Sequence, residues 1–191
     1  IDEWTHFLRD ASNNAVALDE KVAPPKHLQW KCGPMFTRDH DSLASVSALT
    51  SSNGRIFYII DEGPTSLIHR PSKWILIARD AFNGKLLWKR DIQRWITQLA
   101  NFRAGPAQMT RRLVSVGDRV FVTLGLDAPV EMLDAASGHT LRTFAGSEKT
   151  EEIIVHEGTL LAAVGDPNIL TEAAADVVGF WQLEAKGVEP V

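Results

Sequence analysis

Residues 74–90 read WILIARDAFNGKLLWKR, and they indicate the fold of the whole chain. An apolar run is followed by Asp80, by Asn83-Gly84 and by a second apolar run that ends at Trp88. Asn-Gly between two apolar runs is a strong hairpin signal, because both residues tolerate the positive φ of a type I′ turn. The stretch therefore predicts two antiparallel strands joined at Asn83-Gly84.

The same pattern returns in residues 132–139, which read MLDAASGH. Asp80 and Asp134 are 54 residues apart, and so are Gly84 and Gly138. A hairpin that recurs at a fixed spacing indicates a repeated structural unit. Further short strands precede each hairpin, so each unit is expected to be an antiparallel meander of four strands.

The repeat predicts an all-β fold built from antiparallel four-stranded units. Three units are expected, of which the third is incomplete, at residues 43–92, 106–146 and 151–191. An N-terminal extended or irregular segment, residues 1–42, precedes them and contains one short predicted strand at 27–32. That strand is expected to be the outer strand of a unit or a strand that closes one.

Four-stranded meanders at a period of about 40 to 54 residues are typical of β-propeller blades. Ala78 to Trp88 resembles the tryptophan-docking motif A-x-D-x-x-T-G-K-x-x-W of the quinoprotein-type eight-bladed propellers, with Asn83 in place of Thr. The chain is similar to PQQ-binding-like β-propeller repeat proteins over about residues 43–191. The match is weaker in the second unit, where Arg142 replaces the docking Trp.

The resemblance implies structural roles for the motif residues. In the family, the Trp lies between neighbouring blades on the Gly of the adjacent motif, and the Asp holds the turn. The residues that carry these roles here are Ala78, Asp80, Gly84, Trp88, Asp134 and Gly138. The resemblance therefore predicts a buried Trp88 and an exposed Arg142, and it assigns no catalytic residue.

Two and a half to three blades cannot close an eight-bladed ring, which would need roughly 320 to 430 residues at this period. We expect the remaining blades of the same protein, or other protein chains, to complete the propeller. The chain opens on Ile1, which favours a segment of a longer protein.

Composition and charge exclude several classes of partner. The chain has 20 basic and 24 acidic residues and a net charge of −4, so no basic excess favours nucleic acid. No apolar run approaches the roughly 20 residues of a membrane helix, so membrane insertion is not expected. Cys32 is the single cysteine, which excludes an intrachain disulfide and a multi-cysteine metal site.

The resemblance also raises pyrroloquinoline quinone and calcium as cofactors. Dehydrogenases of the family hold calcium with Glu, Asn and Asp, use a catalytic Asp, and often carry a ring formed by two adjacent cysteines. Cys32 alone cannot form that ring, and no calcium motif can be matched residue by residue. The resemblance alone favours a periplasmic or other extracytoplasmic location.

The densest polar cluster consists of Arg38, Asp39, His40 and Asp41. His40 between two carboxylates could bind a metal ion or act as a general base. Adjacent residues in a loop need not converge, however, so we favour a solvated loop in which the Asp side chains cap turns. No pair of the other histidines has the spacing of metal ligands, and no metal site is predicted.

The function predicted from the sequence is a non-catalytic β-propeller repeat module that acts as an interaction or scaffold domain of a larger protein. One alternative is part of a quinone-dependent dehydrogenase, and another is a sensor domain that binds a small ligand at the propeller mouth.

Residues 113–116 align with residues 153–156, and this alignment predicts contacts between successive innermost strands. It brings two arginines and two glutamates together, namely Arg111, Arg112, Glu151 and Glu152. A guanidinium can pair with a carboxylate through two parallel hydrogen bonds, so at least one Arg–Glu contact is expected there.

Overall fold

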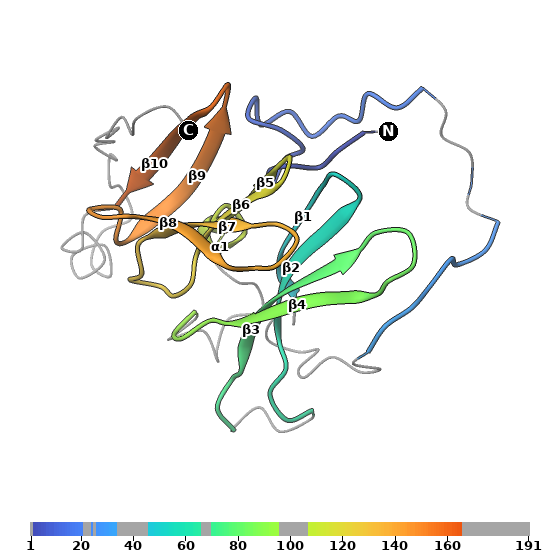
Figure 1. The fold of residues 1–191 in the computed structure, drawn as a ribbon, viewed down its shortest axis with the longest axis horizontal. Helices are drawn as coiled ribbons and strands as arrows, with labels where there is room; N and C mark the ends of the chain where they lie inside the picture. The colour runs from blue at the N-terminus through green and yellow to red at the C-terminus, as the bar shows by residue number, and fades with distance from the viewer. Residues whose placement is uncertain are drawn as a thin grey trace.

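The structure is a computed structural model that describes residues 2–20, 24, 26–33, 46–65, 70–95 and 107–165. Within these ranges the chain forms antiparallel sheets of four, four and two strands and one single-turn helix, α1 (Ala107–Thr110). Figure 1 shows the three sheets arranged one after another, without closure into a ring. The predicted all-β fold of a partial propeller is confirmed.

The first sheet consists of β1 (Val46–Ser52), β2 (Arg55–Asp61), β3 (Trp74–Asp80) and β4 (Leu86–Asp91), and its spatial order follows the chain. The β1–β2 turn is Asn53-Gly54, with φ angles of 48° and 72°. Positive φ at both central residues is the signature of the two-residue type I′ turn, which matches the twist of the flanking strands.

The second sheet consists of β5 (Leu113–Val116), β6 (Arg119–Thr123), β7 (Val130–Asp134) and β8 (Thr140–Phe144), again in chain order. The third sheet contains β9 (Thr150–His156) and β10 (Thr159–Val164). The third strand predicted for this unit lies outside the described residues, and the limits of the three predicted units stay predictions.

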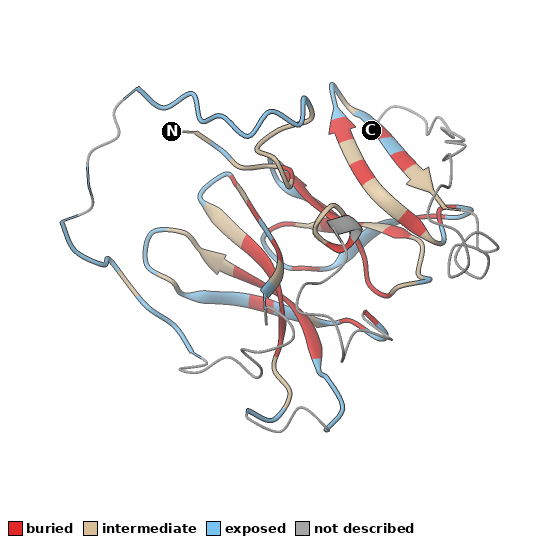
Figure 2. Ribbon diagram, turned by 180° about the vertical axis from the view of Figure 1, so that it is seen from behind, coloured by how far each residue is buried: buried red, intermediate tan, exposed pale blue. Residues whose placement is uncertain are grey.

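The core lies between the faces of successive sheets, as the buried central strands in Figure 2 show. Between the first and second sheets, Phe57 and Leu76 pack in one cluster with Val122 and Leu133. Between the second and third, the cluster is formed by residues that include Phe121, Met132, Ile153 and Leu160. Each large apolar side chain buried in this way contributes about 1.5–3 kcal/mol, so stacking of the sheets stabilises the fold.

The first strands of the sheets lie next to one another, since β1 contacts β5 and β5 contacts β9. Just before β5, Arg111 Nη1 forms an ion pair with Glu152 Oε2 of β9 at 3.0 Å. The backbone N–H of Ile153 donates to Arg111 O at 3.0 Å. The predicted Arg–Glu contact is confirmed, and it joins the innermost strands of two neighbouring sheets.

The hairpin predicted at Asn83-Gly84 forms, but its loop is longer than a type I′ turn. Gly84 has a φ of 73°, whereas Asn83 is not among the residues with positive φ. The N–H of Asp80 donates to Lys85 O at 3.0 Å, so the loop between these two residues contains four residues. The prediction of a two-residue turn was wrong because the Asp80 carboxylate binds the loop amides and favours the longer turn.

The strand predicted at 27–32 is also wrong, because no strand is present among the described residues 26–33. A strand requires a neighbour that accepts and donates backbone hydrogen bonds. The contacts of this segment are made instead by side chains, chiefly that of Trp30. In Figure 1 the N-terminal trace passes β5 and then runs down the side of the first sheet.

Candidate functional site

The two equivalent hairpins each contain an Asp that binds its own loop. Asp80 Oδ1 accepts hydrogen bonds from the backbone N–H groups of Phe82 and Asn83, both at 2.9 Å. Asp134 Oδ1 accepts from the N–H and the hydroxyl of Ser137, at 2.8 and 2.7 Å. These bonds hold the pKa of the Asp134 carboxyl below its ordinary value. Both carboxylates act as turn acceptors.

Trp88 of β4 connects the first sheet to the second. Its indole N–H donates to Ala135 O at 2.9 Å, and its ring lies directly over Gly138, whose φ is 73°. Within its own sheet the ring packs against Phe57 at a centroid distance of 5.9 Å. Trp88 is 9% exposed, so its predicted burial between sheets is confirmed. Ala78, its partner in the β3–β4 register, is fully buried.

Arg142 of β8 is exposed, as predicted, one unit after Trp88. Its guanidinium carbon lies 4.9 Å from the centroid of the Phe144 ring, a cation–π contact within the same strand. The six residues assigned by resemblance to the docking motif thus surround the two hairpins. Their role as the motif of that family stays a prediction.

A second tryptophan makes the same kind of contact with the first sheet. The indole N–H of Trp30 donates to Ala81 O at 2.9 Å, and its ring lies over Gly84. Sequence reasoning missed this residue because nothing around Trp30 matches the docking motif. The available signal was the tryptophan itself, on a short segment of alternating polar and apolar residues before the first unit.

An arginine binds the carbonyl of each glycine that a tryptophan covers, but the two arginines come from different sheets relative to the glycine. In the second sheet, Gly138 O accepts from Arg90 Nη1 at 2.6 Å, and the donor lies in β4 two residues beyond the docked Trp88. In the first sheet, Gly84 O accepts from Arg79 Nη1 at 2.8 Å, within the same sheet. The position two residues beyond Trp30 is Cys32, which cannot provide a guanidinium.

The N-terminal turn, residues 4–9, lies across the free edges of the innermost strands. Three consecutive residues each accept a backbone N–H from a different sheet: Trp4 O from Ser51 at 2.7 Å, Thr5 O from Ser115 at 2.9 Å, and His6 Nε2 from Val155 at 3.1 Å. The turn therefore ties β1, β5 and β9 together where the sheets converge.

His6 is buried at 4% exposure and acts as a neutral acceptor. Since Nε2 accepts the N–H of Val155, the ring proton lies on Nδ1, which contacts Thr5 Oγ1 at 2.8 Å. Burial lowers the pKa of His6 to about 4, although the Asp10 and Glu152 carboxylates oppose this shift. At neutral pH the histidine is an uncharged structural link.

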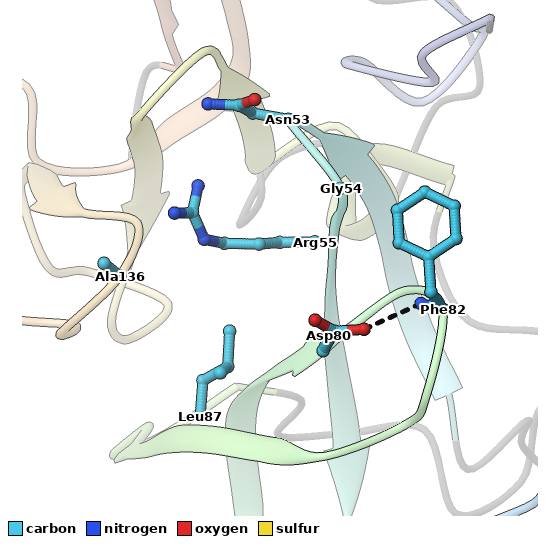
Figure 3. Close-up of a pocket in the computed structure, with 7 residues that line it drawn as sticks. All are labelled: Asn53, Gly54, Arg55, Asp80, Phe82, Leu87 and Ala136. Carbon is cyan, nitrogen blue, oxygen red and sulfur yellow. Dashed lines mark hydrogen bonds between the residues drawn. The ribbon is translucent and has the colours of Figure 1, made fainter.

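An open hollow of about 380 Å³ lies between the hairpins of the first two sheets (Figure 3). Its lining contains Asn53, Gly54, Arg55, Asp80, Phe82, Leu87 and Ala136. Asp118 Oδ1 accepts from Arg55 Nη1 at 2.8 Å and from Asn53 Nδ2 at 2.9 Å. Asn53 and Arg55 pair with Asp118 across the two sheets and Asp80 binds its own loop, so the lining shows no convergent set of free polar groups.

The predicted polar cluster, Arg38, Asp39, His40 and Asp41, lies outside the described residues. In the parts that are described, no three or more His, Cys, Asp or Glu side chains are grouped as metal ligands. The donor set in these parts does not fit a calcium–quinone site, and the single Cys32 cannot form the two-cysteine ring. No described helix is long and apolar enough to cross a membrane.

No protein-family profile matches the sequence, and no curated protein matches it. Among solved structures, a europium-containing methanol dehydrogenase matches with a TM-score of 0.52 at 13% identity, covering 85% of this chain and 27% of the enzyme. A quinohemoprotein alcohol dehydrogenase from Comamonas testosteroni matches with a TM-score of 0.45 at 14% identity, and the match covers 85% of this chain and 23% of the enzyme. BamB from Moraxella catarrhalis matches with a TM-score of 0.36 at 18% identity, and the match covers 62% of this chain and 30% of BamB.

The fold is thus that of a partial β-propeller, and the resemblance found in the sequence is confirmed at the level of the fold. The chain spans about a quarter of the length of the methanol dehydrogenase that it matches, 27%.

Proposed function

We propose that the chain is a non-catalytic β-propeller module that serves as an interaction or scaffold domain of a larger protein. The N-terminal turn is the observation that carries the proposal. Its residues bind the free edges of β1, β5 and β9, the strands that converge towards the axis of a ring. The N-terminal turn therefore occupies the strand edges that a ligand bound on the axis would contact.

Three described groups with acid–base potential support the same proposal, because they serve the fold. His6 is buried and neutral, and it accepts a backbone N–H. Asp80 and Asp134 are acceptors for their own turns. None of these three side chains is free to act as a general acid or base on a substrate.

The outer strands supply surface for a protein partner. Leu86 of β4 is 41% exposed and Leu141 of β8 is 48% exposed. The outer edge of β8 pairs with no other strand in the described part of the chain. A free strand edge with exposed apolar side chains suits addition of a strand from another polypeptide.

A photo-crosslinking amino acid at Leu141 tests this surface in the intact protein. The proposal expects one dominant crosslinked polypeptide at Leu141 and none at the control position, the exposed turn residue His139. Leu141→Asp should abolish the crosslinked complex while the thermal melt stays unchanged. Equal, diffuse crosslinking at both positions would argue against an interaction surface on β8.

An activity assay distinguishes the alternative function, part of a quinone-dependent dehydrogenase, from this proposal. Purified protein is incubated with pyrroloquinoline quinone and calcium, and dye reduction is measured with alcohols and sugars. We expect no turnover above a heat-inactivated control and no rise in melting temperature. Dye reduction that requires both quinone and calcium would overturn the non-catalytic assignment.

A further inference from the structure

Two buried polar side chains of the second sheet have polar atoms without a hydrogen-bond partner. Arg112, just before β5, is 5% exposed, and its Nη1 donates to Leu126 O at 2.7 Å, whereas its Nε has no acceptor. Thr123, the last residue of β6, is fully buried, and its Oγ1 has no partner either. Most buried polar groups in proteins are hydrogen-bonded, so these two require an explanation.

The two side chains lie at the same level of the second sheet, next to the third. Thr123 follows Phe121 at a spacing of two along β6, and Phe121 belongs to the apolar cluster between these sheets. Leu113 pairs with Val122 across β5 and β6. The residue before this pair, Arg112, and the residue after it, Thr123, are therefore neighbouring positions.

Glu151 of β9 approaches them from the third sheet, because β9 contacts both α1 and β6. The register between β9 and β10 shifts here, so Glu151 is an extra residue in β9 with no partner in β10. Such a bulge redirects a side chain. Burial raises the pKa of the Glu151 carboxyl, and the charge of Arg112 opposes this shift, so the two charged groups are within interaction range. Glu151 is half-buried and is therefore reached from solvent.

The adjacent residues show the same two charges fully paired. Arg111 and Glu152 form an ion pair at 3.0 Å, and Asn13 Nδ2 donates to Glu152 Oε1 at 3.4 Å. Arg112 and Glu151 come from neighbouring positions, yet within the described ranges the Glu151 carboxylate has no hydrogen bond or ion pair. The guanidinium and the carboxylate thus stay apart, each with unused hydrogen-bonding capacity.

We propose that Arg112, Thr123 and Glu151 bind a small zwitterion of the amino-acid class between the second and third sheets. The carboxylate of the ligand accepts from Arg112 Nε and the Thr123 hydroxyl, and its ammonium donates to the Glu151 carboxylate. A ligand with a carboxylate alone would be repelled by Glu151, and an amine alone would leave Arg112 without an acceptor. The site goes beyond the proposed module function and does not depend on it.

NMR of the arginine Nε–H groups in the intact protein at neutral pH tests the site, with glycine and acetate as probes. The Nε–H signal of Arg112 reports binding directly, because this group has no partner in the free protein. Glycine should shift the signal to saturation and should bind at least about tenfold more tightly than acetate. The factor corresponds to about 1.4 kcal/mol, which one charge-assisted hydrogen bond supplies.

Three variants assign the binding to these side chains. Glu151→Gln should weaken glycine binding about tenfold and leave acetate binding no weaker, because it removes both the acceptor of the ammonium and the repulsion of acetate. Thr123→Val, which keeps the shape without the hydroxyl, should weaken the binding of both probes. Glu152→Gln is the matched control, because Glu152 pairs with Arg111, and it should leave both affinities unchanged.

An Arg112 signal that glycine does not shift, or equal affinities for glycine and acetate, would overturn the proposal. Equal losses of glycine binding in Glu151→Gln and Glu152→Gln would also overturn it. The comparison of the two probes uses the wild type, so it stands even where a variant fails to fold. Neither probe tests crosslinking at Leu141 or dye reduction, so failure of this inference is distinguishable from failure of the module function.

Discussion

Trp88 covers Gly138 of the neighbouring sheet so closely that a Cβ on this glycine would lie 2.6 Å from the indole ring. The indole N–H also donates to the carbonyl oxygen of Ala135, at 2.9 Å. One side chain therefore combines apolar burial with a buried hydrogen bond, and both depend on the position of the second sheet relative to the first.

Replacing Trp88 with Ala should lower the free energy of unfolding by about 3–5 kcal/mol, as truncation of large core aromatics does. Trp88→Phe should cost less, because it keeps an aromatic ring and loses mainly the hydrogen bond to Ala135. Urea denaturation measures both. A loss of less than about 1 kcal/mol for the alanine variant would contradict the role of Trp88 between sheets.

Gly138→Ala should destabilise the protein more than Gly146→Ala. Both glycines have positive φ, 73° and 82°, so both substitutions carry the backbone cost of about 1–2 kcal/mol. Only Gly138 faces an indole, whereas nothing lies within 4 Å of a Cβ at Gly146. The additional loss at Gly138 should be about 1–3 kcal/mol, the usual range for overpacking. Equal losses would show that the close approach of Trp88 is not needed.

Stability should fall as the pH drops from about 6.5 to about 4 because of His6. Its pKa is about 4 in the folded protein and close to 6.5 when unfolded, so the unfolded state binds the proton first. The stabilisation is fully present above pH 6.5, is lost as the pH falls to 4, and amounts to roughly 3 kcal/mol. Urea melts across this range measure it.

His6→Gln supplies the matched variant for this experiment, because an amide oxygen can accept the N–H of Val155 without titrating. Its stability should depend less on pH between 6.5 and 4 than that of the wild type. His139→Gln, at an exposed turn, is the control that should leave the pH dependence unchanged. The same pH dependence in His6→Gln as in the wild type would assign the effect to other groups.

The Arg111–Glu152 ion pair should contribute little to stability. Its side chains are 35% and 23% exposed, so water and salt screen the attraction, and such pairs contribute at most about 1 kcal/mol. Glu152→Gln should reduce the free energy of unfolding by less than this amount, and the reduction should shrink in 1 M NaCl. A loss of several kcal/mol would mean that the pair holds the two sheets together.

The repeat could be predicted from the sequence because its signals are local. The turn residues at Gly84 and Gly138, the alternating strands and Trp88 all lie within short stretches whose chemistry dictates the hairpin. The alignment of successive units also brought the Arg111–Arg112 pair to the Glu151–Glu152 pair, and the contact that forms between them is Arg111 with Glu152.

The contacts of the N-terminal part could not be predicted in the same way. His6 and Val155 are 149 residues apart, and no local pattern marks a histidine that accepts a distant backbone N–H. The segment around Trp30 has the composition of a strand, but a strand forms only where a neighbouring edge is available. The loop after Asp80 differs from the predicted turn because a side chain, rather than the Asn-Gly pair, sets its length.

A crystal or cryo-electron-microscopy structure of the intact protein tests the central claim most directly. If the chain is a module of a propeller, successive sheets are related by a constant rotation of about 45° around one axis, as in an eight-bladed ring. Residues 4–9 then lie at that axis against β1, β5 and β9. Sheets without a common axis, or a quinone in the place of the N-terminal turn, would contradict the account.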